Sequence, residues 1–244
     1  MPRSREMIRI AQETFDLSAF TGYFGRKSPN PPRHLPFCYL GKKRLDRAIE
    51  VYKKTIPNGS DDKFNITWKP YALDPTLPPG RSFPVLERMA QKFGADRQDA
   101  ITKRLTLMGQ GEGICFSFQG KLGNTRDAHR LVQLARNKDG EKGSEVQEKL
   151  MAALMASYFE QGGDITDRAT LLEAAVKAGL ERGEAESWLE EGKGGDEVDT
   201  EIEEAYARGI RGVPHFIINN KYEIGGAQEV EAFLADFVRA KESA

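Results

Sequence analysis

The segment Gly212-Val213-Pro214-His215-Phe216-Ile217-Ile218 places a proline at the entrance to a short apolar run. Proline is tolerated at the first residue of a strand because it has no N–H group to donate, so this run predicts a strand late in the chain. Near the other end, Leu35-Pro36-Phe37-Cys38 places a proline where a helix is expected to begin. The two segments predict a late strand and an early helix with a cysteine in its first turn.

The residues around these segments predict further helices and strands at both ends of the chain. Residues 45–52 repeat apolar side chains at helical spacing, and residues 64–68 alternate apolar and polar side chains as a half-buried strand does. Residues 215–218 and 221–224 predict a hairpin, because Asn219-Asn220 between them tolerates positive φ. An amphipathic helix over residues 230–237 follows.

The middle of the chain shows almost no strand pattern. Helical patterns cover residues 84–93, 96–109, 125–137, 144–161, 167–178, 182–190 and 195–208. Because strand-bearing ends enclose this block, we expect the ends to pair in one sheet of an α/β fold. Residues 35–74 and 210–244 then form one domain, residues 75–209 an all-helical insertion, and residues 1–34 an atypical lead-in with a short helix or strand near residues 7–15.

Composition narrows the classes of partner and compartment. The 244 residues carry 36 basic and 37 acidic side chains, a net charge of −1, so we expect neither nucleic acid nor a membrane as partner. No apolar run reaches the roughly 18 residues of a membrane span, and charged residues interrupt the start, so we expect a cytoplasmic protein. Cys38 and Cys115 are then expected as thiols, and no spacing of ligands predicts a metal site.

Three separated motifs resemble one family. Residues 37–45, 124–131 and 212–214, in this order, resemble the FrnE-like branch of the DsbA-like thioredoxin family, and residues 222–228 are similar to its closing hairpin and helix start. The resemblance implies a thioredoxin-like fold with a large helical insertion. It also implies a C-x-x-C pair at the start of the first helix, used for thiol–disulfide exchange.

The chain departs from that family at the motif itself. Leu35 stands where the first cysteine is expected, and Cys38 takes the position of the second. No strand pattern runs directly into the motif, so we expect the first strand to be missing or atypical and the activity to be impaired. Two explanations stay open: an error in the gene model over residues 1–34, or a diverged copy that has lost the cysteine.

The resemblance implies roles for five residues. Cys38 is the candidate catalytic residue, with a buried structural cysteine as the alternative. Val213 and Pro214 are expected to bind a thiol peptide next to a cis peptide bond. Gly226 and Gln228, ahead of the last helix, are expected to hold a carboxylate such as that of glutathione.

Three functions remain open at this point. The first is a DsbA/FrnE-like thiol–disulfide oxidoreductase acting on a thiol or disulfide peptide or on glutathione. The second is a glutathione-dependent isomerase or transferase, similar to kappa-class transferases and 2-hydroxychromene-2-carboxylate isomerases, and the third is a non-catalytic thiol- or peptide-binding module. We expect no tightly bound cofactor, glutathione as co-substrate, and leave a homodimer open. Arg126 is a further candidate for an anionic substrate, and His129 is interpreted as a buried histidine.

Overall fold

A computed structural model describes residues 7–13, 36–138 and 141–243 of the chain. Its main sheet has four strands in the order β2-β1-β5-β6, formed by β1 (Met7–Glu13), β2 (Lys63–Lys69), β5 (His215–Ile218) and β6 (Tyr222–Gly225). β1 runs parallel to β2 and antiparallel to β5, so that Ile10 lies opposite Ile66 on one side and Ile218 on the other. The two ends of the chain therefore share one sheet, as the sequence predicted.

The first strand is present, so of the two alternatives expected for it, missing or atypical, the first is wrong. Ile8 and Ile10 are each 1% exposed while Arg9 between them is exposed, the two-residue alternation of a strand with one buried face. The sequence predicts residues 7–13 as part of the atypical lead-in of residues 1–34, but they belong to the sheet. The atypical feature is the connection, because residues 14–35, which lie outside the described part, separate β1 from the helix that follows.

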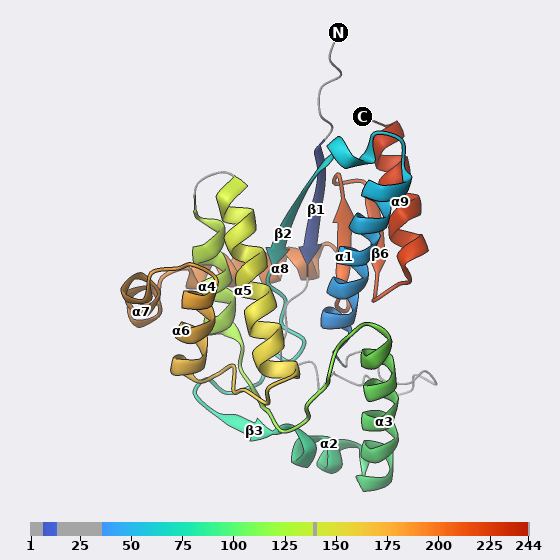
Figure 1. Cartoon of the computed structure of the whole chain (residues 1–244). Helices are drawn as coiled ribbons and strands as arrows, with labels where there is room; N and C mark the ends of the chain where they lie inside the picture. Colours follow the sequence, from blue (N-terminus) through green and yellow to red (C-terminus); the bar gives the residue numbers. More distant parts are fainter. Residues whose placement is uncertain (1–6, 14–35, 139–140, 244) are drawn as a thin grey trace.

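Two helices cover one face of this sheet. α1 (Phe37–Thr55) and α9 (Val230–Glu242) run side by side over it (Figure 1). The ring of Phe237 on α9 lies edge-on to Tyr52 of α1 and Phe64 of β2, with centroids 5.8 and 5.0 Å apart. Phe233 meets Phe216 of β5 in the same way at 4.8 Å. Burial of each such side chain stabilises the fold by about 1.5–3 kcal/mol, so these aromatic contacts fix both helices on the sheet.

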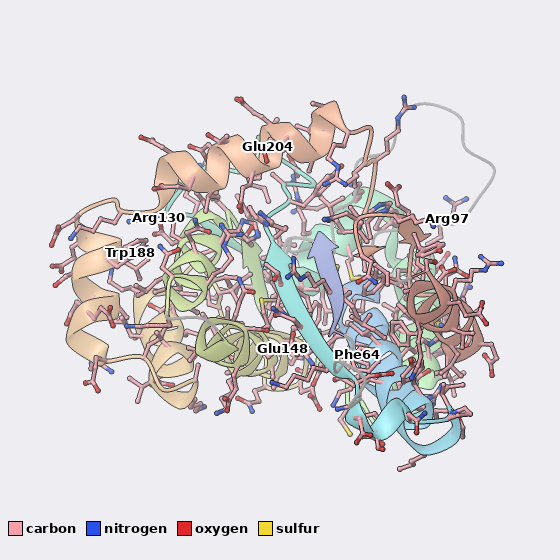
Figure 2. The ribbon with its side chains drawn as sticks, turned by 90° about the horizontal axis from the view of Figure 1, so that it is seen from above. Phe64, Arg97, Arg130, Glu148, Trp188 and Glu204 are labelled. Carbon is pink, nitrogen blue, oxygen red and sulfur yellow. The ribbon has the colours of Figure 1, made fainter. Side chains whose placement is uncertain are left out.

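The insertion is mainly helical, but it is not all-helical. Its helices are α2 (Val85–Phe93), α3 (Ala95–Gly111), α4 (Arg126–Arg136), α5 (Glu141–Phe159), α6 (Arg168–Lys177), α7 (Arg182–Glu190) and α8 (Gly195–Ala207). Two short strands, β3 (Ser82–Pro84) and β4 (Lys121–Gly123), pair antiparallel. Sequence could not reveal them, because three residues with a proline or a glycine are too short to show alternation. α8 crosses the sheet on the side opposite α1 (Figures 1 and 2).

The insertion also closes one edge of the sheet. β2 is an edge strand, and α5 supplies side chains where a further strand would supply backbone groups. Gln147, 1% exposed, accepts from the backbone N–H of Trp68 at 2.8 Å and donates to its carbonyl oxygen at 3.1 Å. The hydroxyl of Ser144 donates to the carbonyl oxygen of Ile66 at 2.7 Å. These bonds satisfy backbone groups that an open edge would leave unpaired.

Candidate functional site

Cys38 lies in the first turn of α1 and is 2% exposed. The turn is closed by the carbonyl oxygen of Pro36, which accepts a hydrogen bond from the backbone N–H of Tyr39 at 3.1 Å. Cys38 and the exposed Cys115 are both thiols and are not joined in a disulfide. Leu35, at the other motif position, lies outside the described residues. The helix start that the sequence predicted is therefore present, with its sulfur shielded from solvent.

The loop before β5 lies against this helix. The peptide bond between Val213 and Pro214 is cis, and Val213 is 4% exposed. A Cβ atom added to Gly41 would lie 2.9 Å from Cγ of Pro214 and 3.1 Å from Cζ of Phe216. Only a residue without a side chain permits such an approach, and Gly41 stands one helical turn after Cys38. The first turns of α1 and the proline loop thus form one contiguous site.

The turn before α9 supports the proline loop. The backbone N–H of Gly226 donates to the carbonyl oxygen of Pro214 at 2.7 Å, and Gly226 has a φ of +80°, which glycine adopts without strain. The side-chain amide of Gln228 donates to the carbonyl oxygen of Gly225 at 2.8 Å. The N–H groups expected to hold a ligand carboxylate are thus engaged within the chain, and Gly226 positions Pro214.

An aromatic cluster surrounds the other side of the helix start. Tyr39 stacks on Phe159 with ring centroids 5.8 Å apart and meets Phe116 edge-on at 6.5 Å. Its hydroxyl donates to Glu160, and burial together with this carboxylate raises the pKa of Tyr39 above its ordinary value. The other carboxylate oxygen of Glu160 accepts from the backbone N–H of Cys115 at 3.4 Å. Tyr39 therefore remains a neutral donor that ties α1 to the end of α5 and to the segment after α3.

Two arginines of α1 bind a buried carboxylate from the insertion. The side chain of Glu112 is 7% exposed and pairs with Arg44 at 2.7 Å and Arg47 at 3.1 Å. Arg44 also donates to the carbonyl oxygen of Ala227 at 2.7 Å and pairs with Glu229 at 2.8 Å. No local pattern in the sequence predicts this network, because Glu112 and its partners are 68 and 65 positions apart.

Arg130 is a structural residue rather than a ligand-binding one. It is 3% exposed, and its guanidinium donates to the carbonyl oxygens of Lys193 (2.8 Å), Trp188 (2.6 Å) and Leu189 (3.1 Å). The guanidinium also donates a hydrogen bond to the carboxylate of Asp127 at 2.6 Å. Figure 2 shows Arg130 and Trp188 on adjoining helices of the insertion. A cation at carbonyl groups that end a helix complements the helix dipole, so Arg130 holds α7 against α4.

The start of α4 carries the other polar residues that the sequence singled out. Asn124 accepts from the backbone N–H of Arg126 at 2.9 Å, which forms an Asx turn just before the helix cap at Thr125. Arg126 binds Asp199 of α8 through two hydrogen bonds of 2.9 and 2.6 Å. His129 is 3% exposed, and burial lowers its pKa to about 3, so it is neutral near pH 7. These groups lie in the insertion, and Arg126 already binds a carboxylate of the chain itself.

Comparison with known proteins identifies the family. The model of the DSBA-like thioredoxin domain matches residues 36–238. The chain belongs to this family. The DsbA-like fold resembles that of a probable DsbA oxidoreductase from Streptomyces coelicolor, with a TM-score of 0.76 and 25% identity over 97% of this chain and 91% of the other. A 2-hydroxychromene-2-carboxylate isomerase shares the fold, with a TM-score of 0.60 and 14% identity over 97% of each chain. Comparison with curated proteins gave no significant match.

The candidate site brings together four of the residues that the sequence singled out, Cys38, Val213, Pro214 and Gly226. Cys38 lies on the helix that contacts the loop of Val213 and Pro214, Gly226 supports that loop, and Gln228 caps its own turn. Within the described ranges, no three His, Cys, Asp or Glu side chains gather as metal ligands. In the same part of the chain, every helix is too short or too polar to cross a membrane. The candidate site thus contains one sulfur, that of Cys38, and the backbone groups of Val213 and Pro214.

Proposed function

We propose that this DsbA-like protein is a thiol–disulfide oxidoreductase of the FrnE type that has lost dithiol turnover, and that Cys38 supports single-thiol exchange with glutathione as co-substrate. The contact between α1 and the proline loop carries the proposal, because Gly41 admits Pro214 at the helix turn that follows Cys38. Backbone groups of Val213 would align an extended peptide beside the thiol, as in other cases of main-chain peptide recognition.

The proposed reaction has two balanced steps. The thiolate of Cys38 attacks one sulfur of a client disulfide, a mixed disulfide forms, and the other client sulfur leaves as a thiolate. A glutathione thiolate then attacks the mixed disulfide, releases Cys38 as a thiolate and leaves the client joined to glutathione. Leu35 supplies no second sulfur, so release requires the external thiol.

The burial of Cys38 favours a second candidate, a binding module without turnover. At 2% exposure, the sulfur is poorly placed for attack on a large disulfide, whereas the proline loop needs no thiol to bind a peptide backbone. The isomerase alternative rests on likeness of fold alone. A cytoplasmic setting, in which glutathione keeps thiols reduced, is part of the proposal.

The test combines exchange with binding. Wild-type protein is incubated with glutathione disulfide and, separately, with a peptide whose cysteine is held in a disulfide, and intact mass spectrometry detects any mixed disulfide. Cys38→Ser should abolish the adduct at that site, and Cys115→Ser should leave it unchanged. Leu35→Cys should restore reduction of insulin disulfides. Peptide binding without any adduct at Cys38 would favour the binding module, whereas the absence of both binding and adduct would overturn the proposal.

A further inference from the structure

A cavity of about 290 Å³ lies between the start of α4, one face of α8 and the segment that follows β2. α8 contributes Asp199, Ile202, Glu203 and Tyr206, whose spacing of three and four residues places them on one face of the helix. Ligand pockets for small molecules begin at about 300 Å³, so this cavity has room for a single side chain rather than for a folded segment.

The lining carries more negative than positive charge. Three carboxylates, Asp74, Asp199 and Glu203, face one guanidinium, that of Arg126, which leaves two negative charges. Arg126 is bound to Asp199, and Asp74 interacts with Lys92 just outside the lining. Glu203 pairs with no residue among those that the structure describes. A cation entering the cavity would therefore meet an available carboxylate at Glu203.

The walls suit an aliphatic stem that ends in a cation. Pro75, Leu77 and Ile202 supply apolar surface along the cavity. Tyr206 is 41% exposed, and its hydroxyl donates to the carbonyl oxygen of Ala72, which holds the ring at the edge of the cavity. Aromatic faces attract ammonium and guanidinium groups, and long basic side chains bury their methylene groups along apolar surfaces.

The cavity is connected to the proline loop through two tyrosines. The ring of Tyr206 lies edge-on to that of Tyr71 with centroids 5.2 Å apart, and the hydroxyl of Tyr71 donates to the carbonyl oxygen of Ile210 at 3.1 Å. Ile210 precedes Pro214 by four residues, a span of at most about 14 Å when extended. A peptide that is bound at the proline loop could therefore place a neighbouring side chain near the cavity.

We propose that this cavity receives the side chain of a lysine or arginine from a client polypeptide. The charged end binds Glu203 beside the ring of Tyr206, and the methylene groups lie on Pro75, Leu77 and Ile202. The inference rests on the proposed peptide binding at the proline loop, and it adds a preference for clients with a basic residue a few positions from their cysteine.

A first experiment tests the cavity without the thiol site. N-acetyl-lysine methylamide and its neutral analogue N-acetyl-norleucine methylamide are titrated into the full chain, and backbone amide NMR shifts at Ala72 and Ile202 report binding. Glu203→Lys should weaken binding of the lysine probe by about five- to tenfold, the size expected when a partly exposed ion pair is replaced by repulsion. Glu204→Lys makes the same change of charge at the next position of α8 and should retain binding. Equal binding of both probes, no binding, or equal loss in both variants would overturn the proposal.

A second experiment uses cysteine peptides that carry lysine or norleucine at a neighbouring position. Fluorescence anisotropy should show tighter binding of the lysine peptide, and Glu203→Lys should remove that difference. If the lysine probe binds the cavity but neither peptide binds, the function proposed for the proline loop fails while the cavity stands. If both peptides bind equally well, the loop function stands and a role of the cavity in client choice is excluded.

Discussion

The substitution Gly41→Ala tests the contact on which the candidate site depends. The added methyl group would lie 2.9 Å from Cγ of Pro214 and 3.1 Å from Cζ of Phe216. Neither neighbour yields easily, because Pro214 is a ring held by the N–H of Gly226 at 2.7 Å and Phe216 is 0% exposed. Overpacking of this kind costs about 1–3 kcal/mol. The higher helix propensity of alanine stabilises the folded chain by up to about 1 kcal/mol. The free energy of unfolding is therefore expected to fall by roughly 0–2 kcal/mol.

A matched substitution separates the two effects. Gly183→Ala places the same methyl group in the first turns of α7, where nothing lies within 4 Å of it. It should stabilise the protein by about 0.5–1 kcal/mol, since only propensity and the entropy of the unfolded chain change. The difference between the two variants in their free energies of unfolding isolates the packing cost of the methyl group at Gly41 and should amount to about 1–3 kcal/mol.

Equilibrium unfolding in urea measures both variants. The chain has two tryptophans, and their fluorescence follows different parts of it, Trp68 the sheet and Trp188 the insertion. Stabilisation of Gly41→Ala to the same extent as Gly183→Ala, within about 0.5 kcal/mol, would show that α1 and the proline loop are not in contact. The conclusion that α1 and the proline loop form one contiguous site would then be wrong.

Three further predictions concern buried polar groups. Arg130→Met should lower the free energy of unfolding by about 3–5 kcal/mol because three carbonyl groups lose their donor, whereas the half-exposed Arg168→Met should change it by less than about 0.5 kcal/mol in the same urea assay. Gln147→Leu should cost about 2–4 kcal/mol by leaving the backbone of Trp68 unpaired, and an unchanged urea midpoint would contradict this. The pKa of His129, about 3 when folded, lies below its unfolded value, so the unfolded chain binds more protons between the two. Stability should therefore fall as pH drops below about 6.5, by up to about 1.4 kcal/mol per pH unit, and His129→Gln should flatten that slope.

Most of the helices were predictable because a long amphipathic repeat begins and ends close to the first and last residues of its helix. The patterns at residues 182–190 and 195–208 correspond to α7 and α8 almost residue for residue. Asn219 and Asn220, predicted as a hairpin turn, have φ values of 49° and 55°. The sequence around β1 predicts either a short helix or a strand, because its seven residues are few and the expected direct link to the motif is absent. Its place in the centre of the sheet follows only from pairing with β2 and β5, which no local pattern records.

The candidate site was predictable in its residues and not in its contacts. Cys38 in the first turn of a helix and Pro214 before a strand could be found from their neighbours in the sequence. The approach of Pro214 to Gly41 could not, because it depends on how α1 packs on the sheet. The same holds for Glu112, a carboxylate in a glycine-rich segment whose two arginines come from α1. Long-range polar contacts leave no periodicity to detect.

The cover that α5 provides for β2 limits how this protein can be engineered or divided. A chain shortened to the strands, α1 and α9 would keep every residue of the sheet, yet Trp68 and Ile66 would lose the donors and acceptors of Gln147 and Ser144. The exposed edge would then be a template for another β-strand, and self-association through β2 is the expected outcome. Side chains of α5 bind the edge of β2 where a fifth strand would otherwise pair. The smallest part of the chain expected to fold on its own therefore includes the inserted helices.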